Sequence, residues 1–217
     1  KKDNESNLFS TKYDFQKKPL SDSNTLSLGN KTHLEYFLNK DKKRISNKNG
    51  VFMERRKTDS LGRVVSREFL NKDSLLTIHN KSFVSGFHYT YDKNHNIVQK
   101  QLFNHSGKHA KHKDDYNLKF KYDLFGNMVA CISLNEKNEQ IEDKNGVSVY
   151  KYDNDAFGNI IQVKRYNRKG LAVLGSDDFF KSVTDYDEKN RLIFYAKYYF
   201  NNTLKFDDDT KWGATKY

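Results

Sequence analysis

The sequence predicts an all-β protein of tandem antiparallel β-hairpins, with about six units of about 32 residues that form an elongated sheet or a solenoid-like array. A turn signal recurs at a nearly fixed interval. Its last residue, used below as the anchor of each unit, is Asn30, Arg63, Asn96, Asn127, Asn159 or Arg191, with spacings of 33, 33, 31, 32 and 32 residues. No segment keeps a helical hydrophobic period over three turns, whereas short alternating runs bounded by turn residues are frequent.

The composition favours an ordered but thin structure. Apolar residues make up only 35% of the 217 residues, which is too little for a deep hydrophobic core. Aromatic residues nevertheless make up 14% of the chain, whereas disordered chains are poor in aromatic residues. We therefore expect an ordered repeat array with a large surface.

Each unit is expected to contain one tight turn with a fixed chemistry. An Asp at the first position can accept hydrogen bonds from backbone N–H groups further along the turn, and a Gly or Asn at the fourth position tolerates a left-handed conformation. The pattern fits a type I turn followed by a left-handed residue. The predicted turn residues are Asp59, Gly62, Asp92, Asp123, Gly126, Asn127, Gly158, Asn159, Asp187 and Asn190.

One of these turns departs from the pattern. Relative to its glycine, Gly158, Asp153 stands two residues earlier than the Asp of the other turns does. Two further polar residues, Asn154 and Asp155, follow it. We therefore expect a longer or bulged loop over residues 153–158. His95, which tolerates a left-handed conformation less well than Gly or Asn, occupies another glycine position.

The remainder of each unit consists of strands and a second turn. A strand that begins with two apolar residues, such as Met128 and Val129, follows the first turn, and a second turn begins eight residues after the anchor. A last alternating strand, such as 118–122, leads into the next unit. Residues 1–22 have no repeat signal and are expected to form an N-terminal tail or a pairing strand, and residues 23–217 a single β-repeat domain.

The turn 122–127, Tyr-Asp-Leu-Phe-Gly-Asn, together with the strand, the Asn-x-x-Gly turn and the Asp-rich segment that follow it, resembles the bacterial YD-repeat (RHS-like) proteins of the longer-period Tyr-Asp-x-x-Gly-Asn type. The resemblance covers residues 28–217. The first unit departs from the pattern because it has Thr25-Leu26 where Tyr-Asp would stand, and the second because Thr58 replaces the Tyr. It implies an extended β scaffold that is secreted, periplasmic or on the cell surface of a bacterium, with no catalytic residues to carry over.

One loop contains a dense group of metal-ligand side chains. The candidate metal ligands are His105, His109, His112, Asp114 and Asp115. Their spacing would gather three imidazoles if the loop were helical. The equivalent loops of the other units have no histidine, which favours a solvated and variable loop, and we expect no cofactor.

The net charge of +11 has two interpretations. Scattered lysines are typical of a solvated surface, and a basic protein is also attracted to anionic partners. Cys131 is the single cysteine, so no internal disulfide can form, and its apolar strand predicts an inert thiol. No apolar run reaches the roughly 18 residues of a transmembrane helix, so we do not expect a transmembrane protein.

The predicted function is non-enzymatic. Catalytic groups are normally unique in a fold, whereas these Asp turns repeat with the backbone. A candidate binding face is formed by Tyr150, Tyr152, Tyr195, Tyr198 and Tyr199. Interleaved tyrosines and lysines can bind nucleic acid, but alternating aromatic residues first of all stabilise sheets.

The leading hypothesis is an exported bacterial β-repeat scaffold that binds a protein or glycan partner along its face. The first alternative is an anionic-polymer binding module for acidic glycan or nucleic acid, of which nucleic acid is not favoured. The second alternative is a carboxylate-based hydrolase. An exposed strand at either end of the array also predicts self-association through strand edges.

Overall fold

The computed structural model describes residues 9–13, 31–108, 117–205 and 214–216. Every helix or strand within these ranges is a β-strand, which confirms the all-β prediction. The strands are β1 (Phe9–Tyr13), β2 (Thr32–Leu38), β3 (Met53–Thr58), β4 (Val64–Leu70), β5 (Gly86–Tyr91), β6 (Ile97–Phe103), β7 (Asn117–Tyr122), β8 (Met128–Leu134), β9 (Val149–Asn154), β10 (Ile160–Tyr166), β11 (Lys181–Tyr186), β12 (Leu192–Tyr198) and β13 (Ala214–Lys216). Within the described ranges, no helix is long and apolar enough to cross a membrane.

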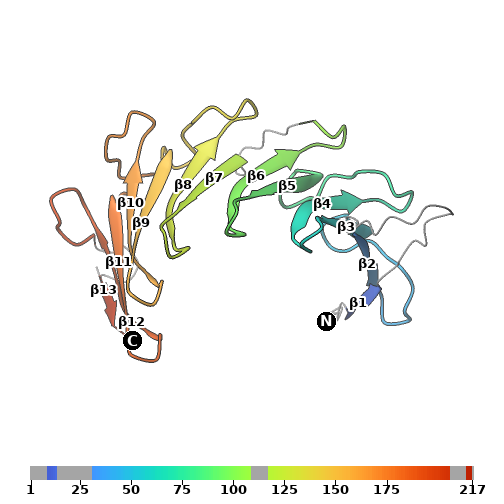
Figure 1. Cartoon of the computed structure of the whole chain (residues 1–217), viewed down its shortest axis with the longest axis horizontal. Coiled ribbons are helices and arrows are strands. Elements are labelled where there is room, and N and C mark those ends of the chain that lie inside the picture. The colour runs from blue at the N-terminus through green and yellow to red at the C-terminus, as the bar shows by residue number, and fades with distance from the viewer. Residues whose placement is uncertain (1–8, 14–30, 109–116, 206–213, 217) are drawn as a thin grey trace, which may run out of the picture. The chain divides into compact units, whose positions relative to one another are not determined.

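The strands follow one another in chain order in an open antiparallel sheet, as expected for tandem hairpins (Figure 1). β1 pairs with β2. The chain divides into two compact units, and the division passes through the β5–β6 hairpin. Unit 1 contains β1–β4, with Gly86–Thr90 of β5, and unit 2 contains residues 91–99 and β7–β13.

The first turn of each repeat has the same hydrogen bonds in both compact units. In unit 1, the Asp59 N–H donates to the Arg63 carbonyl at 2.9 Å and the Gly62 N–H donates to the Asp59 carbonyl at 3.0 Å. In unit 2, Asp123 and its turn repeat this pattern at 3.0 and 3.2 Å. The fourth turn residue has a positive φ in both, 78° at Gly62 and 86° at Gly126. This is a type I turn with a left-handed fourth residue.

The expectation of a longer loop over residues 153–158 is wrong. The Asp155 N–H donates to the Asn159 carbonyl at 3.0 Å and the Gly158 N–H to the Asp155 carbonyl at 3.1 Å, so Asp155 occupies the aspartate position of an ordinary turn. Asp153 lies within β9, where it pairs with Gln162 of β10. The Tyr-Asp pair at 152–153 is therefore out of phase with the repeat.

A second turn ends each second strand. The Asn135 N–H donates to the Glu139 carbonyl at 2.9 Å, and Asn135 Oδ1 accepts N–H groups from Lys137 and Glu139 at 2.9 Å each. Asn138, its fourth residue, has a φ of 63°. The equivalent turns that begin at Asn71, Asn104 and Asn167 have the same carbonyl acceptor pattern.

The two faces of the sheet are defined by the strand register, because paired residues point to the same face. Face A has Phe69, which pairs with Glu54, and face B has Glu68, which pairs with Arg55. The β3–β4, β7–β8, β9–β10 and β11–β12 hairpins each contain a register shift just after the turn, such as that opposite Lys57 and Thr58. This bulge places an extra residue in the second strand and changes the alternation of faces by one residue.

The core of unit 1 lies on face A. Phe69, Phe87 and Leu102 pack with Val51 and Val84, which come from the loops before β3 and β5, and all five are almost fully buried. Full burial of an apolar side chain of this size contributes roughly 1.5–3 kcal/mol. This small cluster, supported by one residue from each loop, fits the low apolar content.

Unit 2 has a more polar core. Val147 and Phe179 occupy the repeat positions of Val51 and Val84, and they are also buried. However, Arg165, which is only 8% exposed, occupies the position of Leu102. Its Cζ lies 3.5 Å from the Phe179 ring centroid and its Nη1 donates to the Leu174 carbonyl at 3.0 Å. Arg165 also pairs with Asp177. Burial raises the pKa of Asp177, but Arg165 outweighs it and holds that pKa below its usual value.

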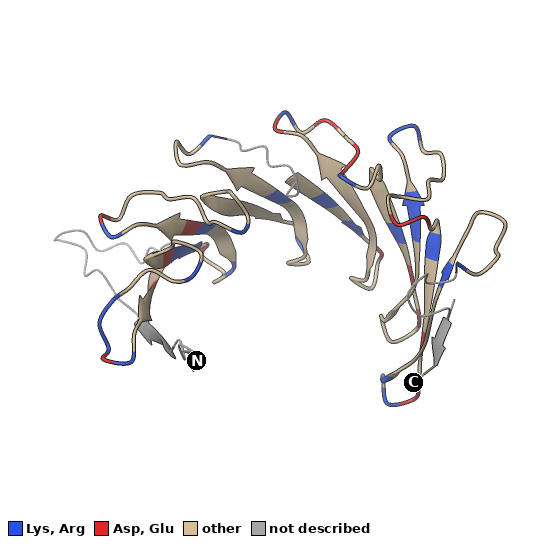
Figure 2. Cartoon of the chain, turned by 180° about the vertical axis from the view of Figure 1, so that it is seen from behind, with Lys and Arg blue, Asp and Glu red and all other residues tan. Residues whose placement is uncertain are grey.

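Ion pairs cover both faces of the β3–β4 hairpin in unit 1, where acidic and basic residues lie side by side on the strands (Figure 2). On face B, Glu68 pairs with Arg55 and, at 2.6 Å, with Lys57. On face A, Glu54 accepts from Arg67 Nε at 2.7 Å and from Arg56 Nε at 2.6 Å. Burial raises the pKa of each Glu, but the basic partners outweigh this effect, and both pKa values are below the ordinary one.

Candidate functional site

The candidate site lies along the first turns of unit 2, between the turns 123–127 and 155–159. The aspartate of each turn fixes the local backbone. Asp123 Oδ1 accepts N–H groups from Phe125 and Asn127 at 2.9 Å each, and its Oδ2 accepts the Asn127 Nδ2 at 3.1 Å. Desolvation raises the pKa of Asp123, but these hydrogen bonds outweigh it and lower that pKa. Asp155 makes the same bonds to Phe157 and Asn159.

The residue before each aspartate links its hairpin to the preceding one. The Tyr122 hydroxyl donates to the Ile97 carbonyl at 2.9 Å. Asn154 takes the tyrosine position in the next unit, and its Nδ2 donates to the Met128 carbonyl at 3.0 Å. In unit 1, the Thr58 hydroxyl donates to the carbonyl of residue 31 at 3.3 Å. Each acceptor is the residue that follows an anchor, so three different side chains serve one structural role.

The turns also approach each other closely. A Cβ at Gly158, which has a φ of 85°, would lie only 2.7 Å from Asn127 Oδ1. Further along the row, Asn159 Nδ2 donates to Asn190 Oδ1 at 3.0 Å. Glycine is therefore needed at residue 158 both for its backbone conformation and for the contact with the neighbouring turn.

Large apolar side chains are exposed at the tips of two consecutive turns. The exposed fractions are 98% for Leu124, 90% for Phe125 and 79% for Phe157, and we call these three residues the tip cluster. The same turn positions have polar residues in the neighbouring hairpins of unit 2, such as Lys93 and Lys189. In unit 1, Leu61 occupies the turn position of Phe125 and is 63% exposed. The side chains of the tip cluster take no part in the turn hydrogen bonds, which use the backbone N–H groups of Phe125 and Phe157.

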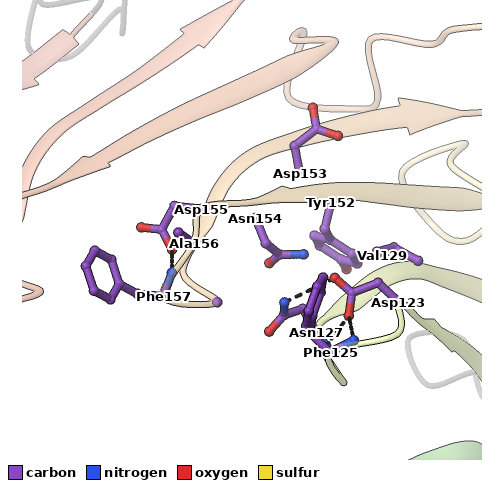
Figure 3. Close-up of a pocket in the computed structure, with 11 residues that line it drawn as sticks. Asp123, Phe125, Asn127, Val129, Tyr152, Asp153, Asn154, Asp155, Ala156 and Phe157 are labelled. Carbon is purple, nitrogen blue, oxygen red and sulfur yellow. Dashed lines mark hydrogen bonds between the residues drawn. The ribbon is translucent and has the colours of Figure 1, made fainter.

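A cleft of about 780 Å³ lies between these two turns. Asn154 lies between the two turns, Tyr152 lies beside Phe125, and the Phe157 ring points away from the turn of Phe125 (Figure 3). Burial raises the pKa of Tyr152, which stays protonated. The cleft is lined by Asp123, Phe125, Asn127, Val129, Tyr152, Asp153, Asn154, Asp155, Ala156, Phe157 and Gly158. This lining combines apolar surface with carboxylate and carboxamide groups that can accept hydrogen bonds.

The five tyrosines of the predicted binding face do not share one face. Tyr150 and Tyr152 lie on face A because they pair with Arg165 and Val163, and Tyr195 is on the same face. Tyr198 pairs with Lys181 and lies on face B, and Tyr199 begins the second turn of the last hairpin.

Tyr150 has a structural role. Its hydroxyl donates to Asp143 Oδ2 at 2.7 Å. Burial, together with the nearby Asp143 carboxylate, raises the pKa of Tyr150 to about 12. Of the five tyrosines, Tyr152 is the one that lines the cleft.

The predicted metal ligands are only partly described. His105 is exposed in a second turn, whereas His109, His112, Asp114 and Asp115 lie outside the described residues. The described ranges contain no group of three or more His, Cys, Asp or Glu that could hold a metal ion.

The sequence interpretation does not single out Leu124, Phe125 and Phe157, the exposed apolar residues of the candidate site. The signal was present, because apolar residues at the two central positions of a tight turn must point into solvent. It was treated as part of the turn motif, since Tyr-Asp-x-x-Gly-Asn leaves these two positions unspecified. Among the described residues, the three most exposed large apolar side chains therefore lie at the variable positions of the motif.

No protein-family model matches the sequence, and no curated protein matches it. Solved structures show similarity. A crystal structure of TcdB2-TccC3-Cdc42 has a TM-score of 0.41 and 12% identity, covering 85% of this chain and 9% of that chain. The Photorhabdus luminescens Tc holotoxin pore has a TM-score of 0.42 and 13% identity, covering 81% and 8%. TcdB2-TccC3-TEV has a TM-score of 0.35. This chain thus spans less than a tenth of the length of these chains.

Proposed function

We propose that this chain is a non-enzymatic β-repeat scaffold that binds a protein partner at the tip cluster and the adjoining cleft. The single observation that carries the proposal is the near-complete exposure of Leu124, Phe125 and Phe157 on consecutive turns. Neighbouring exposed apolar groups mark interaction sites, and aromatic side chains provide much of the binding free energy in protein interfaces.

The chemistry of the cleft defines the partner further. An apolar side chain of the partner would contact Tyr152 and Val129, and its N–H or basic groups would face the carboxylates of Asp123 and Asp155. A segment with one large apolar residue flanked by basic residues fits this combination.

Two features support a binding role without catalysis. The polar groups Asp123, Asn127, Asp155 and Asn159 all hold turns, and their equivalents recur in other units of the chain. The resemblance of the turn motif to exported YD-repeat scaffolds supports a role outside the bacterial cytoplasm. We therefore propose an exported scaffold whose specificity lies in the variable turn positions.

The test selects peptide ligands from a displayed library with the full chain as bait and measures their affinity by calorimetry. We expect selected peptides with one aromatic or aliphatic anchor beside basic residues. A Phe125→Ser/Phe157→Ser variant should lose most of the affinity, because aromatic truncation in an interface typically costs about 2 kcal/mol or more. The matched control is Lys189→Ser, at the same turn position in the next hairpin.

The turn backbone bonds do not depend on these side chains, so circular dichroism and thermal unfolding should be unchanged in both variants. Peptides that bind both variants equally well would contradict the proposal, as would a library from which no ligand is selected. A parallel screen against neutral glycans covers the other partner class. Glycan binding that depends on Phe125 and Phe157, without peptide binding, would replace the protein partner by a glycan.

A further inference from the structure

Face B of unit 2 has a row of lysines that crosses the strands. Lys151 of β9 pairs directly with Lys164 of β10, and Lys164 pairs directly with Lys181 of β11. On the other side, Lys151 pairs with Ala130 of β8, which pairs with Lys121 of β7. We call Lys121, Lys151, Lys164 and Lys181 the lysine row. The C-terminal strands, at the right of Figure 2, accordingly have basic residues along their length.

This arrangement is unfavourable for the sheet by itself, because like charges directly opposite each other on neighbouring strands are destabilising. Lys164 has a lysine on both sides. Within the described part of the chain, it is also the member of the row that has an ion pair, with Asp153 Oδ2 at 2.9 Å. The row therefore retains positive charge that a sheet optimised for stability would neutralise.

Aromatic rings hold two of these ammonium groups in place. Lys151 Nζ lies 4.6 Å from the Tyr166 ring centroid, and Lys181 Nζ lies 5.0 Å from the Tyr198 ring centroid. Lys181 Nζ also donates to Asn202 Oδ1 at 2.7 Å. Cation–π contacts restrict a lysine without neutralising it. The charges are thus positioned before any ligand arrives.

One end of the row lies in a shallow groove of about 560 Å³. Lys121, Lys151, Gln140 and Asp153 provide its polar groups, and Ile132 and Val149 provide apolar surface. The Asp153 carboxylate is held by its ion pair with Lys164. Such a groove can hold the apolar face of a sugar ring, with the lysines beside its acidic substituent and the Gln140 carboxamide beside its hydroxyl groups.

We propose that the lysine row binds an acidic polysaccharide with its chain crossing strands β7–β11. Neighbouring strands lie about 4.8 Å apart, so Lys151, Lys164 and Lys181 repeat their charge at about the length of one sugar ring with one carboxylate or sulfate. Lys121 lies two strands from Lys151, because Ala130 occupies the position on β8. The phosphates of duplex DNA repeat at about 3.4 Å along each strand, which matches less well. The Tyr166 and Tyr198 rings lie beneath ammonium groups, so they do not offer platforms for stacking bases.

Calorimetry with the full chain and a size-defined oligogalacturonate, which has one carboxylate per ring, tests this proposal. The fully methyl-esterified oligomer is the matched neutral probe, and oligothymidylate represents nucleic acid. We expect the acid form to bind at low salt, the ester to bind far more weakly, and affinity for the acid form to fall as salt rises.

The Lys151→Gln/Lys164→Gln variant should lose the preference for the acid form over the ester. It should also reduce the slope of log affinity against log salt by about 2, one for each lysine removed. The control variant, Lys93→Gln/Lys189→Gln, changes the net charge equally at exposed turn tips and should bind like the unmodified chain. Arginine at residues 151 and 164 should retain binding.

Three results would overturn the proposal. Equal losses in the row variant and the turn-tip variant would show that only net charge matters. Tighter binding of oligothymidylate, lost when Lys151 and Lys164 are replaced, would assign the row to nucleic acid instead. Absence of measurable binding to the acid oligomer at low salt would leave the row without this ligand. Circular dichroism of each variant verifies that the comparison is between folded proteins.

Discussion

The β3–β4 hairpin of unit 1 and the β9–β10 hairpin of unit 2 have the same turn, bulge and strand lengths, but they handle charge in opposite ways. In the first hairpin, Arg55 lies directly opposite Glu68 and pairs with it. In the second, the same two repeat positions are occupied by Lys151 and Lys164. The first hairpin neutralises its directly opposed charges in an ion pair, whereas the second has two ammonium groups directly opposite each other.

The diagonal contact, between residues offset by two positions from the directly opposed pair, is favourable in both hairpins. Lys57 pairs with Glu68 in unit 1, and the equivalent pair in unit 2, Asp153 with Lys164, has its charges reversed. A favourable contact is therefore retained at one position, while the direct pair is repulsive. The repeat backbone therefore accommodates either arrangement: direct ion pairs in unit 1, and directly opposed lysines in unit 2.

The largest expected effect comes from Glu68→Lys, which gives unit 1 the charge pattern of unit 2. Glu68 is only 5% exposed and accepts from two basic residues, so the substitution leaves Arg55 and Lys57 facing a third cation. Breaking a buried ion pair typically costs about 3–5 kcal/mol. We expect a loss of about 3 kcal/mol in the free energy of unfolding, measured by urea titration.

Glu188→Lys, at an exposed turn tip of unit 2, is the control for the charge change and should alter stability by roughly 0.5 kcal/mol or less. Amide hydrogen exchange would locate the loss of protection of Glu68→Lys in β3 and β4. If Glu68→Lys were as harmless as the control, the ion pairs of unit 1 would have no stabilising role and the comparison would fail.

Acid should weaken the same ion pairs by a smaller amount, because protonation removes a charge without adding repulsion. The pKa values of Glu54 and Glu68 in the folded protein are lowered from the ordinary value of 4.5. Their contribution to stability is therefore fully present above about pH 5 and is lost as the pH falls through the lowered values. A Glu54→Gln/Glu68→Gln variant should show a shallower decline of unfolding free energy over this range.

The turn aspartates are present in both the original chain and the double variant. The difference between the two pH profiles therefore gives the contribution of Glu54 and Glu68 alone. Identical slopes for the original chain and the double variant would contradict the assignment. Urea unfolding followed by circular dichroism at several pH values provides both profiles.

The turns and strands were predictable from the sequence because their chemistry is local. Gly126 and Asn190 occupy left-handed positions, and Asp123 accepts the expected backbone N–H groups. The expectation for residues 153–158 is wrong because it follows the Tyr152-Asp153 pair and not the spacing between the Asp and Gly positions of the turn. The distance of three residues from Asp155 to Gly158 already matched the other turns.

The faces of the sheet were much harder to predict. Tyr195 and Tyr198 are three residues apart in β12, so strand alternation alone places them on opposite faces. Each bulge changes the alternation by one residue, so the face of a residue before the bulge relative to one after it depends on a register shift that has no clear sequence signal. The lysine row depends on the register of five successive strands. A long-range juxtaposition of this kind, here Lys151 with Lys164 and Lys181, follows from pairing geometry and not from any motif.

The smallest expected effect separates stability from recognition at a single residue. Lys151→Glu places a carboxylate opposite Lys164 and should raise the free energy of unfolding by roughly 0.2–1 kcal/mol, the range of a cross-strand charge pair. The gain is limited because Lys151 also loses its contact with the Tyr166 ring. Lys119→Glu is the matched control, since Lys119 has the same repeat position on β7 but lies opposite Ile132. It should bring no gain. A Lys151→Glu protein that is less stable than the original would mean that the opposed lysines are not repulsive, and the contrast between the two hairpins would then lose its energetic basis.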